Sequence, residues 1–373
     1  MRIDVTDEFL KLVAINSPSG EEGELAKYLV QKLRELGAEA FEDNSASLTG
    51  SNTGNIIGLF PGNPEKPTIL LAAHMDTVEP TTGMIPQVKD GKIYSDGQNI
   101  LGADNKAGLA VILSVLQTLK LEESSDPVSV EHGPIEILFT VQEEVGLKGI
   151  KNCDYQFQAQ YGYVLDGDGP VGTIVNASPS HITLDLTVEG KAAHAGLEPE
   201  MGVNAIVVSS EAIAGLPFGR LDQETTSNLG VISGGKARNI VADRVNIKAE
   251  VRSRKRERLE EETAKIITKF TNTAQKFGAQ FKYEKEMAYE AFTIDPQHPT
   301  IIRAIKAGQK MDIDVTWKAT GGGLDANILN ARGLACVALG LGNEKPHSYE
   351  EYADIAELEK ARRFIVEILK QTA

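Results

Sequence analysis

The chain has 373 residues, of which 41% are hydrophobic and 24% charged, so it is long enough to build two domains with packed cores. It carries 53 acidic and 38 basic residues, and its net charge of −15 argues against nucleic acid or an anionic membrane as a partner. Cys153 and Cys336 lie far apart without a Cys-x-x-Cys pair, which argues against a disulfide framework or a cysteine-rich zinc site.

Two segments bear on where the protein resides. Residues 1–17 are charged and lack the apolar stretch of a signal peptide. The most apolar segment, residues 107–119, is shorter than a membrane span and contains polar side chains. We therefore expect a cytoplasmic enzyme.

Most of the chain alternates between predicted helices and strands. Residues 6–36 have helical periodicity, interrupted by the Ser-Pro-Ser-Gly segment at 17–20. Strands that alternate with helices indicate an α/β fold, a mostly parallel sheet with helices on both faces. The apolar runs predict strands at 55–60, 67–74, 134–141, 161–165 and 334–339, with further helices at 107–120 and 356–369.

The middle of the chain follows another pattern. Between His181 and Tyr289 the expected order is strand-helix-strand-strand-helix-strand, that of an α+β ferredoxin-like unit. Proline-containing segments at 178–180 and 295–296 mark its borders. We predict a discontinuous catalytic domain of residues 1–178 and 294–373, with an inserted domain of residues 179–293.

Histidine and acidic side chains follow the predicted strands at their carboxyl ends, the edge where open α/β sheets collect their chemistry. Each residue has an ordinary alternative, such as a helix cap, a solvated turn or an exposed loop histidine. Together, however, the carboxylates would repel one another strongly unless a cation were bound among them. The residues at this edge are His74, Asp76, Asp104, Glu143, Glu144, Asp166 and His347.

Two divalent cations that share one carboxylate would relieve this repulsion. Histidine and carboxylate ligands without thiolates suit zinc, with cobalt or manganese as alternatives. Two such ions, about 3.5–4 Å apart, activate a shared water and polarise a carbonyl oxygen. A neighbouring carboxylate that is not a ligand can then take a proton from that water.

These motifs resemble those of the di-zinc peptidases and deacylases, the family that includes peptidase T, carboxypeptidase G, aminoacylase and succinyl-diaminopimelate desuccinylase. The resemblance also rests on Gly102-Ala-Asp104-Asn-Lys106-Ala-Gly108 and Gly190-Lys-Ala-Ala-His194-Ala-Gly196, and it covers nearly the whole chain. It implies a zinc exopeptidase-like fold. The likeness is greatest to peptidase T, through Gly322-Gly323-Leu324-Asp325 and Lys345-Pro-His347-Ser-Tyr-Glu350.

The resemblance implies two metal sites that share Asp104. His74 and Asp166 would complete one site, and Glu144 and His347 the other.

The same resemblance gives roles to two residues that are not ligands. Glu143 would be the general base that later protonates the leaving amine, and Asp76 would orient the His74 imidazole. The peptide bond between Asp104 and Asn105 would be cis.

The inserted domain carries three further candidates by resemblance. His194 would stabilise the developing oxyanion, and Asn239 and Arg252 would hold the substrate's backbone and carboxylate. An ordinary loop histidine, a turn and a solvated strand end remain as alternatives for these positions. The resemblance also suggests a homodimer through this domain, with His194 reaching the partner's active site.

The glycine run at 321–323 departs from two known patterns. It lacks the lysine and serine of a phosphate-binding loop, so we expect close backbone approach to substrate or sheet instead. Peptidase T has an arginine before its Gly-Gly-Thr-Asp, where this chain has Thr320-Gly321, so strict tripeptide specificity does not carry over.

We predict a metal-dependent exopeptidase that cleaves short peptides. The metal ligands fit an amidohydrolase of N-acyl amino acids equally well. A metal-binding interaction protein without catalysis is a third reading, but it would not need Glu143.

Overall fold

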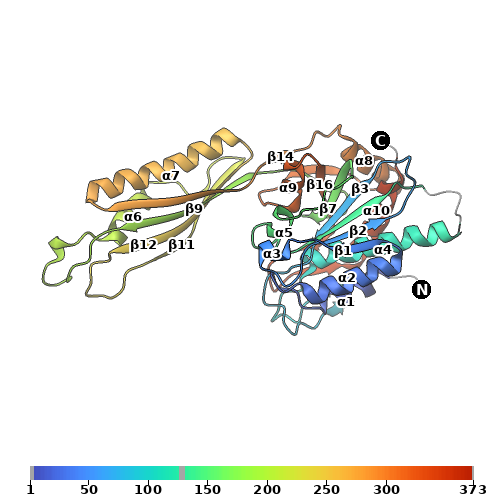
Figure 1. The fold of residues 1–373 in the computed structure, drawn as a ribbon, viewed down its shortest axis with the longest axis horizontal. Coiled ribbons are helices and arrows are strands. Elements are labelled where there is room, and N and C mark those ends of the chain that lie inside the picture. Colours follow the sequence, from blue (N-terminus) through green and yellow to red (C-terminus); the bar gives the residue numbers. More distant parts are fainter. Residues whose placement is uncertain (1–3, 126–130, 372–373) are drawn as a thin grey trace. The chain divides into compact units, whose positions relative to one another are not determined.

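The computed structural model describes residues 4–125 and 131–371, which form two compact units (Figure 1). The larger unit comprises Met1–Ala177, Thr293–Ala319 and Leu324–Ala373. The smaller unit comprises Ser178–Phe292 together with Thr320–Gly323. This last segment falls in the range predicted for the sheet domain, yet it groups with the smaller unit.

A nine-stranded sheet forms the centre of the larger unit, in the order β1-β2-β6-β3-β7-β16-β8-β14, with β15 paired to β8. Strands β6, β3, β7 and β16 run parallel to one another. Strand β2 joins β6 antiparallel and β8 joins β16 antiparallel, whereas β15 runs parallel to β8. Every residue of β3 and β6 is buried, as expected for parallel strands covered on both faces. The strands are β1 (Glu39–Glu42), β2 (Ile56–Phe60), β3 (Ile69–His74), β6 (Ile135–Thr140), β7 (Tyr161–Gly167), β8 (Thr173–Ser178), β14 (Phe292–Thr293), β15 (Thr316–Ala319) and β16 (Ala335–Gly340).

Helices cover both faces of this sheet, so the predicted α/β class is confirmed (Figure 1). Helix α2 shows why the sequence folds this way: Leu25, Leu29 and Leu33 repeat at four-residue spacing, are buried, and precede a left-handed Gly37 that ends the helix. The helices are α1 (Val5–Val13), α2 (Gly23–Leu36), α3 (Ala46–Thr49), α4 (Ala103–Ser125), α5 (Lys148–Lys151), α8 (Pro299–Met311), α9 (Asp325–Ala331) and α10 (Ile355–Lys370).

A second, four-stranded sheet lies in the larger unit and was not predicted. Its order is β17-β18-β5-β4, and its strands have only two or three residues each, too few for a recognisable alternation. The loop between β17 and β18 carries His347, so this sheet positions a predicted ligand. The strands are β4 (Gln87–Lys89), β5 (Lys92–Tyr94), β17 (Asn343–Glu344) and β18 (Tyr352–Asp354).

The smaller unit has a five-stranded antiparallel sheet in the order β10-β11-β12-β9-β13. Helices α6 and α7 pack against each other and against this sheet. The order of elements follows the ferredoxin-like pattern expected from the sequence, with the two-residue β10 added at one edge. The elements are β9 (Ser180–Glu189), η1 (Pro199–Met201), α6 (Ala205–Ala214), β10 (Gly219–Arg220), β11 (Thr225–Gly234), β12 (Arg244–Ser253), α7 (Arg256–Phe277) and β13 (Gln280–Tyr289).

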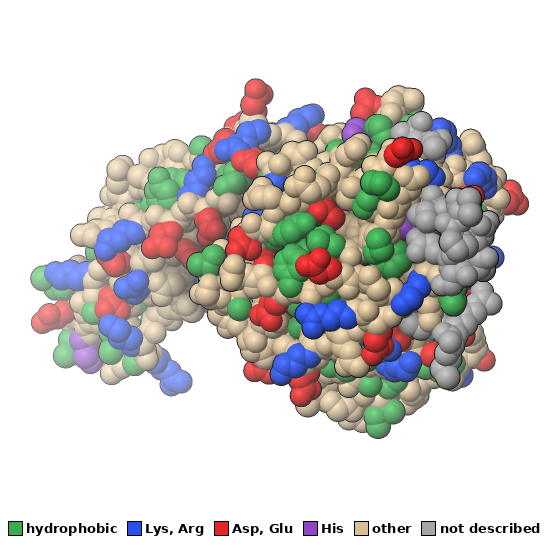
Figure 2. All heavy atoms as spheres, turned by 45° about the vertical axis from the view of Figure 1, so that its right-hand side comes forward, with side chains coloured by type: hydrophobic (Ala, Val, Ile, Leu, Met, Phe, Trp, Pro, Cys, Tyr) green, Lys and Arg blue, Asp and Glu red, His purple; other side chains and the backbone are tan. Residues whose placement is uncertain are grey.

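The surface carries both signs of charge. On the face drawn in Figure 2, basic and acidic side chains are interspersed and form no continuous basic patch. Among the helices in the described part of the chain, none combines the length and apolarity needed to cross a bilayer.

Candidate metal centre

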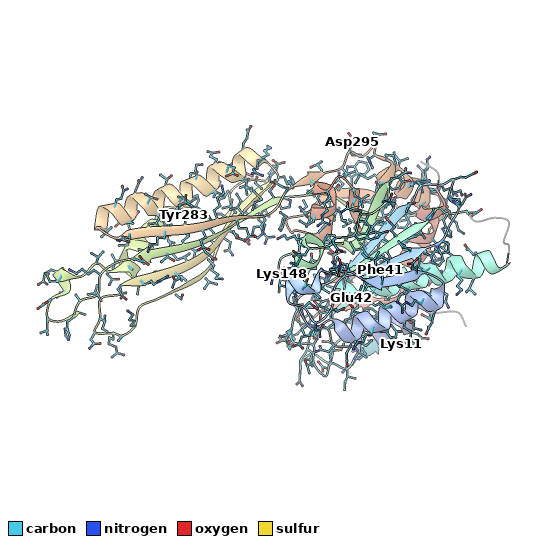
Figure 3. The ribbon with its side chains drawn as sticks, in the orientation of Figure 1. Lys11, Phe41, Glu42, Lys148, Tyr283 and Asp295 are labelled. Atoms are coloured by element: carbon cyan, nitrogen blue, oxygen red, sulfur yellow. The ribbon has the colours of Figure 1, made fainter. Side chains whose placement is uncertain are left out.

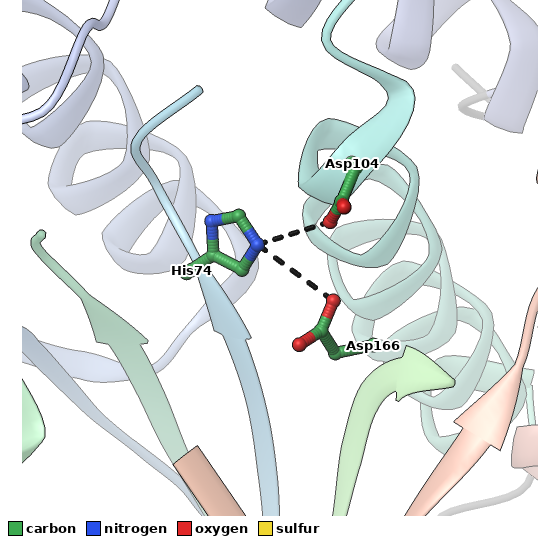
Figure 4. A group of neighbouring side chains, drawn as sticks. All are labelled: His74, Asp104 and Asp166. Atoms are coloured by element: carbon green, nitrogen blue, oxygen red, sulfur yellow. Dashed lines mark hydrogen bonds and ion pairs between the residues drawn. The ribbon is translucent and has the colours of Figure 1, made fainter. Parts of the chain in front are cut away.

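The carboxyl ends of the sheet strands bring together the predicted ligands of the larger unit. His74 is the last residue of β3, Asp166 lies in β7, and Asp104 stands in the first turn of α4 (Figure 4). Glu144 follows β6, and His347 lies between β17 and β18. Parallel strands end at the same edge, which is why residues so distant in sequence meet here.

Asp104 is shared between two groups of side chains. Its Oδ1 lies 3.0 Å from His74 Nε2, and its Oδ2 lies 3.2 Å from His347 Nε2. We call His74, Asp104 and Asp166 the His74 triad, and Asp104, Glu144 and His347 the His347 triad; in each, the potential ligand atoms all lie within 4.8 Å of one another.

The two triads differ in exposure and in what holds them. The His74 ring is only 2% exposed, and its Nε2 lies 3.7 Å from Asp166 Oδ1 (Figure 4). The His347 side chain is 50% exposed, and its Nε2 lies 2.9 Å from Glu144 Oε1. His347 also has a positive φ of 60°, which is uncommon for a residue with a side chain. One half of the centre is therefore buried and the other open.

The backbone at Asp104 is unusual in two ways. Asp104 and Asn105 have non-helical torsion angles within α4, so the helix is kinked at its first turn. The peptide bond between them is cis, as the resemblance implies.

Protons compensate for the crowding of acids in this centre. Burial lowers the pKa of His74, but its hydrogen bonds with Asp104, Asp166 and Asp76 outweigh that effect and raise it well above the usual value. The hydrogen bonds of His347 with Asp104 and Glu144 raise its pKa to about 10. Burial and the charge of Asp104 raise the pKa of Asp166 to about 8. These groups retain protons because they are crowded together.

A divalent cation fits each triad. Every potential ligand atom is an imidazole nitrogen or a carboxylate oxygen, the donors that zinc, cobalt and manganese accept. The two carboxylate oxygens of Asp104 point to different histidines, as a carboxylate shared by two ions requires. Bound cations would also compensate the negative charge of the crowded carboxylates, which protons compensate when no cation is bound.

Glu143 and Asp76 lie beside the triads but belong to neither. Burial raises the pKa of Glu143 well above its usual value; the charge of His74 opposes this rise, and the charges of nearby acids add to it. Asp76 accepts hydrogen bonds from the backbone N–H groups of Glu143 (2.9 Å) and Glu144 (3.2 Å) and from the hydroxyl of Ser19 (2.6 Å). Its carboxylate therefore fixes the turn that carries both glutamates.

Asp76 meets His74 chiefly through its backbone. The Asp76 carbonyl oxygen lies 2.8 Å from His74 Nδ1, whereas its carboxylate Oδ1 is 3.4 Å away. Because Nδ1 is engaged there, the ring directs Nε2 toward Asp104.

Three buried carboxylates near this centre escaped the sequence reasoning. Glu351 accepts the N–H groups of Gly102 and Asp104, and Glu22 accepts those of Gly20 and Gln142. Asp325 accepts the Thr140 hydroxyl at 2.5 Å, and its Oδ1 has no partner among the described residues. Asp325 ends the Gly322-Gly323-Leu324-Asp325 motif, to which the resemblance gives no separate role for this acid, and in sequence the other two look like ordinary loop or helix-start acids.

His194 and Asn239 lie in the smaller unit, on loops that contact each other. His194 forms an isolated β-bridge with Ile240, and the Asn239 carbonyl accepts the N–H of Ala195 at 2.9 Å. The exposed His194 ring accepts N–H groups from Gly196 and Leu197 at Nδ1. This pattern assigns the proton to Nε2, which leaves an outward N–H donor.

Arg252 is the third candidate of the smaller unit, and its guanidinium already forms hydrogen bonds within that unit. Its guanidinium forms two hydrogen bonds with Glu250, and Nη1 donates to the carbonyl of Gly321 at 3.4 Å. The glycine run makes the expected close backbone approach, because a Cβ on Gly323 would overlap the ring of Tyr289 on β13. Arg252 and the glycine run therefore form one local arrangement.

The sequence and the fold are similar to those of known proteins. Residues 70–371 match the model of the peptidase family M20/M25/M40. The uncharacterized protein YqjE of Bacillus subtilis (strain 168) is 40% identical over 368 residues, which are 98% of each chain.

Two solved structures have the same architecture. The structure of aminopeptidase PepT from Bacillus cereus ATCC 10987 is similar with a TM-score of 0.89 and 40% identity, over 98% of this chain and 97% of that one. A tripeptidase from Staphylococcus aureus subsp. aureus mu50 is similar with a TM-score of 0.92 and 36% identity, again over 98% and 97%.

Proposed function

The chain belongs to the peptidase family M20/M25/M40, and on that premise we propose that it is a two-metal exopeptidase that cleaves short peptides. One observation carries this proposal: two ligand triads share Asp104, and Glu143 lies beside them without belonging to either. The similarity to an aminopeptidase and to a tripeptidase supports short peptides as substrates.

The metal ligands would be divided as the triads are. The His74 triad would hold one divalent cation and the His347 triad a second, most simply zinc, with cobalt or manganese as alternatives. When bound, such a pair supplies Lewis acidity that lowers the pKa of a water and polarises the scissile carbonyl.

Glu143 would move the proton. Its carboxylate takes a proton from the attacking water and returns it to the nitrogen of the leaving amine. Burial suits this carboxyl to the second step, because a raised pKa lets it hold the proton that it has collected. Asp76 supports both steps by fixing the backbone of Glu143 and the ring of His74.

The smaller unit would supply the contacts to the substrate. We propose that His194 donates its Nε2 proton in a hydrogen bond to the carbonyl oxygen as negative charge develops there. Asn239 and Arg252 would hold the substrate's backbone and carboxylate. For Arg252 this requires that the substrate compete with Glu250 for the guanidinium.

We also propose a homodimer that forms through the smaller unit and places His194 in the partner's active site. Strand β13 is an edge of the sheet and carries the half-exposed Tyr283 (Figure 3). Exposed strand edges and clustered apolar side chains are natural sites of symmetric pairing. The exposed apolar residues of this unit include Leu197, Met201, Ile206, Val207, Val231 and Ile232.

A cytoplasmic location fits the cysteines. Cys153 and Cys336 are both buried and unpaired, and burial raises the pKa of each thiol, which keeps it protonated and unreactive. Proteins of reducing compartments keep their thiols in this form.

A substrate panel tests the proposed activity. Metal-loaded protein is offered dipeptides, tripeptides and N-acyl amino acids of matched side chains, and Glu143→Ala protein serves as the control for contaminating peptidases. We expect release of free amino acids from the peptides at rates that the variant lacks. Preferential cleavage of N-acyl amino acids would instead identify a deacylase, as the absence of an arginine at Thr320-Gly321 allows. No turnover of either class by protein with both metals bound would overturn the proposal.

A further inference from the structure

Glu351 binds the loop that leads into the bridging acid. Its side chain is 1% exposed, with Oε2 accepting the N–H of Gly102 at 2.8 Å and Oε1 accepting the N–H of Asp104 at 3.0 Å. These amides belong to the non-helical segment that leads into the regular part of α4, and hydrogen bonds from backbone N–H groups to a carboxylate are stronger than those between neutral groups. Both oxygens are thereby occupied by backbone donors.

Glu351 also belongs to the segment that carries His347. It follows His347 by four residues and directly precedes β18, which pairs with β5 and β17 of the small sheet. Its own N–H donates to the carbonyl of Ser348 at 3.1 Å, and the Ser348 hydroxyl donates to the carbonyl of Lys345 at 2.8 Å. The segment from Lys345 to Glu351 is therefore a compact turn that is tied internally.

The two contacts join two separate metal-binding loops. Asp104 and His347 come from different parts of the chain, yet Asp104 Oδ2 lies 3.2 Å from His347 Nε2. The Glu351 carboxylate is bonded to the Asp104 backbone on one side and continuous with the His347 turn on the other. Such a connection limits how far the two side chains can move apart.

Burying a further carboxylate beside this acidic centre has an electrostatic cost. Burial and the charge of Asp104 together raise the pKa of Glu351 to about 7. The two backbone N–H groups that bond its oxygens offset part of this cost, because hydrogen bonds to an ionised group are stronger than those to a neutral one.

We propose that Glu351 is a positioning residue that sets Asp104 and His347 at the separation needed to bind a cation in the His347 triad. The inference rests on the proposed two-metal function and deepens it. The carboxylate acts through the backbone of Asp104 and through the turn of His347, and it touches neither substrate nor cation. The His74 triad depends on it less, because His74 is fixed by β3 and by the Asp76 carbonyl.

The chain offers a matched control in Glu22, which is also fully buried. Glu22 Oε1 accepts the N–H groups of Gly20 and Gln142, and its Oε2 accepts the hydroxyl of Ser51. A glutamine at 22 can keep its carbonyl on both N–H groups and donate its NH₂ to the Ser51 oxygen, since a hydroxyl also accepts.

A glutamine at 351 could not satisfy all of its hydrogen-bond partners in this way. Both oxygens of Glu351 face N–H donors, so the NH₂ of a glutamine would oppose the N–H of either Gly102 or Asp104. The same substitution should therefore be tolerated at 22 and disruptive at 351.

The test compares Glu351→Gln and Glu22→Gln with the wild-type protein. Binding of Zn²⁺ is measured by competition with a chelator of known affinity, and the visible spectrum is recorded after loading with Co²⁺. We expect Glu351→Gln to bind one of the two ions about 10- to 100-fold less tightly, the usual range for groups that support ligands, and the other with wild-type affinity. The Co²⁺ spectrum should change at one of the two equivalents only, and Glu22→Gln should match the wild type in both measurements.

The outcomes separate this inference from the proposed function. If the wild-type protein binds no ion, the two-metal proposal itself is wrong. If it binds two ions and Glu351→Gln binds both with unchanged affinity and spectrum, only the role of Glu351 is refuted. Should Glu351→Gln fail to fold, Glu351→Asp keeps the charge but shortens the side chain by one methylene; it should show the same selective weakening, and wild-type binding would refute the role.

Discussion

The two units hold their candidate functional residues in different ways. In the larger unit His74 is 2% exposed, and the backbone around Asp104, Glu143 and Glu144 is bonded to the buried carboxylates of Asp76 and Glu351. In the smaller unit His194 and Asn239 are exposed and lie on loops. Under the proposed function, the larger unit would hold the metal centre, with its buried half fixed by the sheet, and the smaller unit would present exposed groups to the substrate.

Removal of the proposed general base from the larger unit should have the largest effect on turnover, and it distinguishes that base from a metal ligand. Glu143→Ala removes a carboxylate that lies outside both triads, so we expect kcat to fall at least about 10²-fold while both ions remain bound. Glu144→Ala removes a member of the His347 triad and should lose one ion. Steady-state kinetics with elemental analysis of both variants checks this. Equal metal loss by the two variants, with near wild-type turnover for Glu143→Ala, would show that the roles are assigned wrongly.

His194 tests what the smaller unit contributes. His194→Ala should lower kcat about 10²- to 10³-fold, the scale for loss of one oxyanion donor, with metal content unchanged. If His194→Ala instead loses metal, then the smaller unit also affects metal binding, and the proposed difference between the two units is wrong.

Mixing two inactive variants then shows whether His194 acts between chains. A mixed dimer of Glu143→Ala and His194→Ala would contain one complete site if His194 is shared, so activity should return to about half that of wild type per mixed dimer. Absence of recovery after proven subunit exchange would mean that His194 acts within its own chain or not at all.

The glycine run should give the smallest effect, and one confined to the smaller unit. Gly323→Ala would place a Cβ against the Tyr289 ring and force one of them to move, at about 1–3 kcal/mol of unfolding free energy. Gly321→Ala is the matched control, because a Cβ there meets nothing within 4 Å. Chemical denaturation of both variants, with metal content measured alongside, checks this. A larger loss for Gly321→Ala would refute the packing account.

Much of the architecture follows from patterns that a sequence displays openly. Long apolar runs predicted β3, β6, β7 and β16, and helical periodicity predicted α2. The small sheet escaped because its strands are two or three residues long, and they are stabilised by pairing between distant segments such as β5 and β18. Patterns within a short stretch of sequence cannot reveal pairing between distant segments.

Prediction of the candidate site from the sequence has the same limit, because tertiary partners are not visible in local patterns. The conjunction of histidines and acids at strand ends predicted which side chains of the larger unit would gather. Glu22 and Glu351 were not predicted, because a buried acid that accepts backbone N–H groups reads like a solvated one until the fold supplies its partners. Gln142 and His347 also have positive φ angles, which the identity of neither residue is sufficient to predict.

The most direct test of the central claim is the number of divalent ions bound per chain by the wild-type protein and by Asp104→Ala. Because both triads share this carboxylate, we predict about two ions for the wild type and none held tightly by the variant. The measurement is elemental analysis after metal loading and removal of excess, with circular dichroism to verify that both proteins are folded. A folded wild-type protein without bound metal, or an Asp104→Ala variant that still binds two ions, would contradict the shared centre.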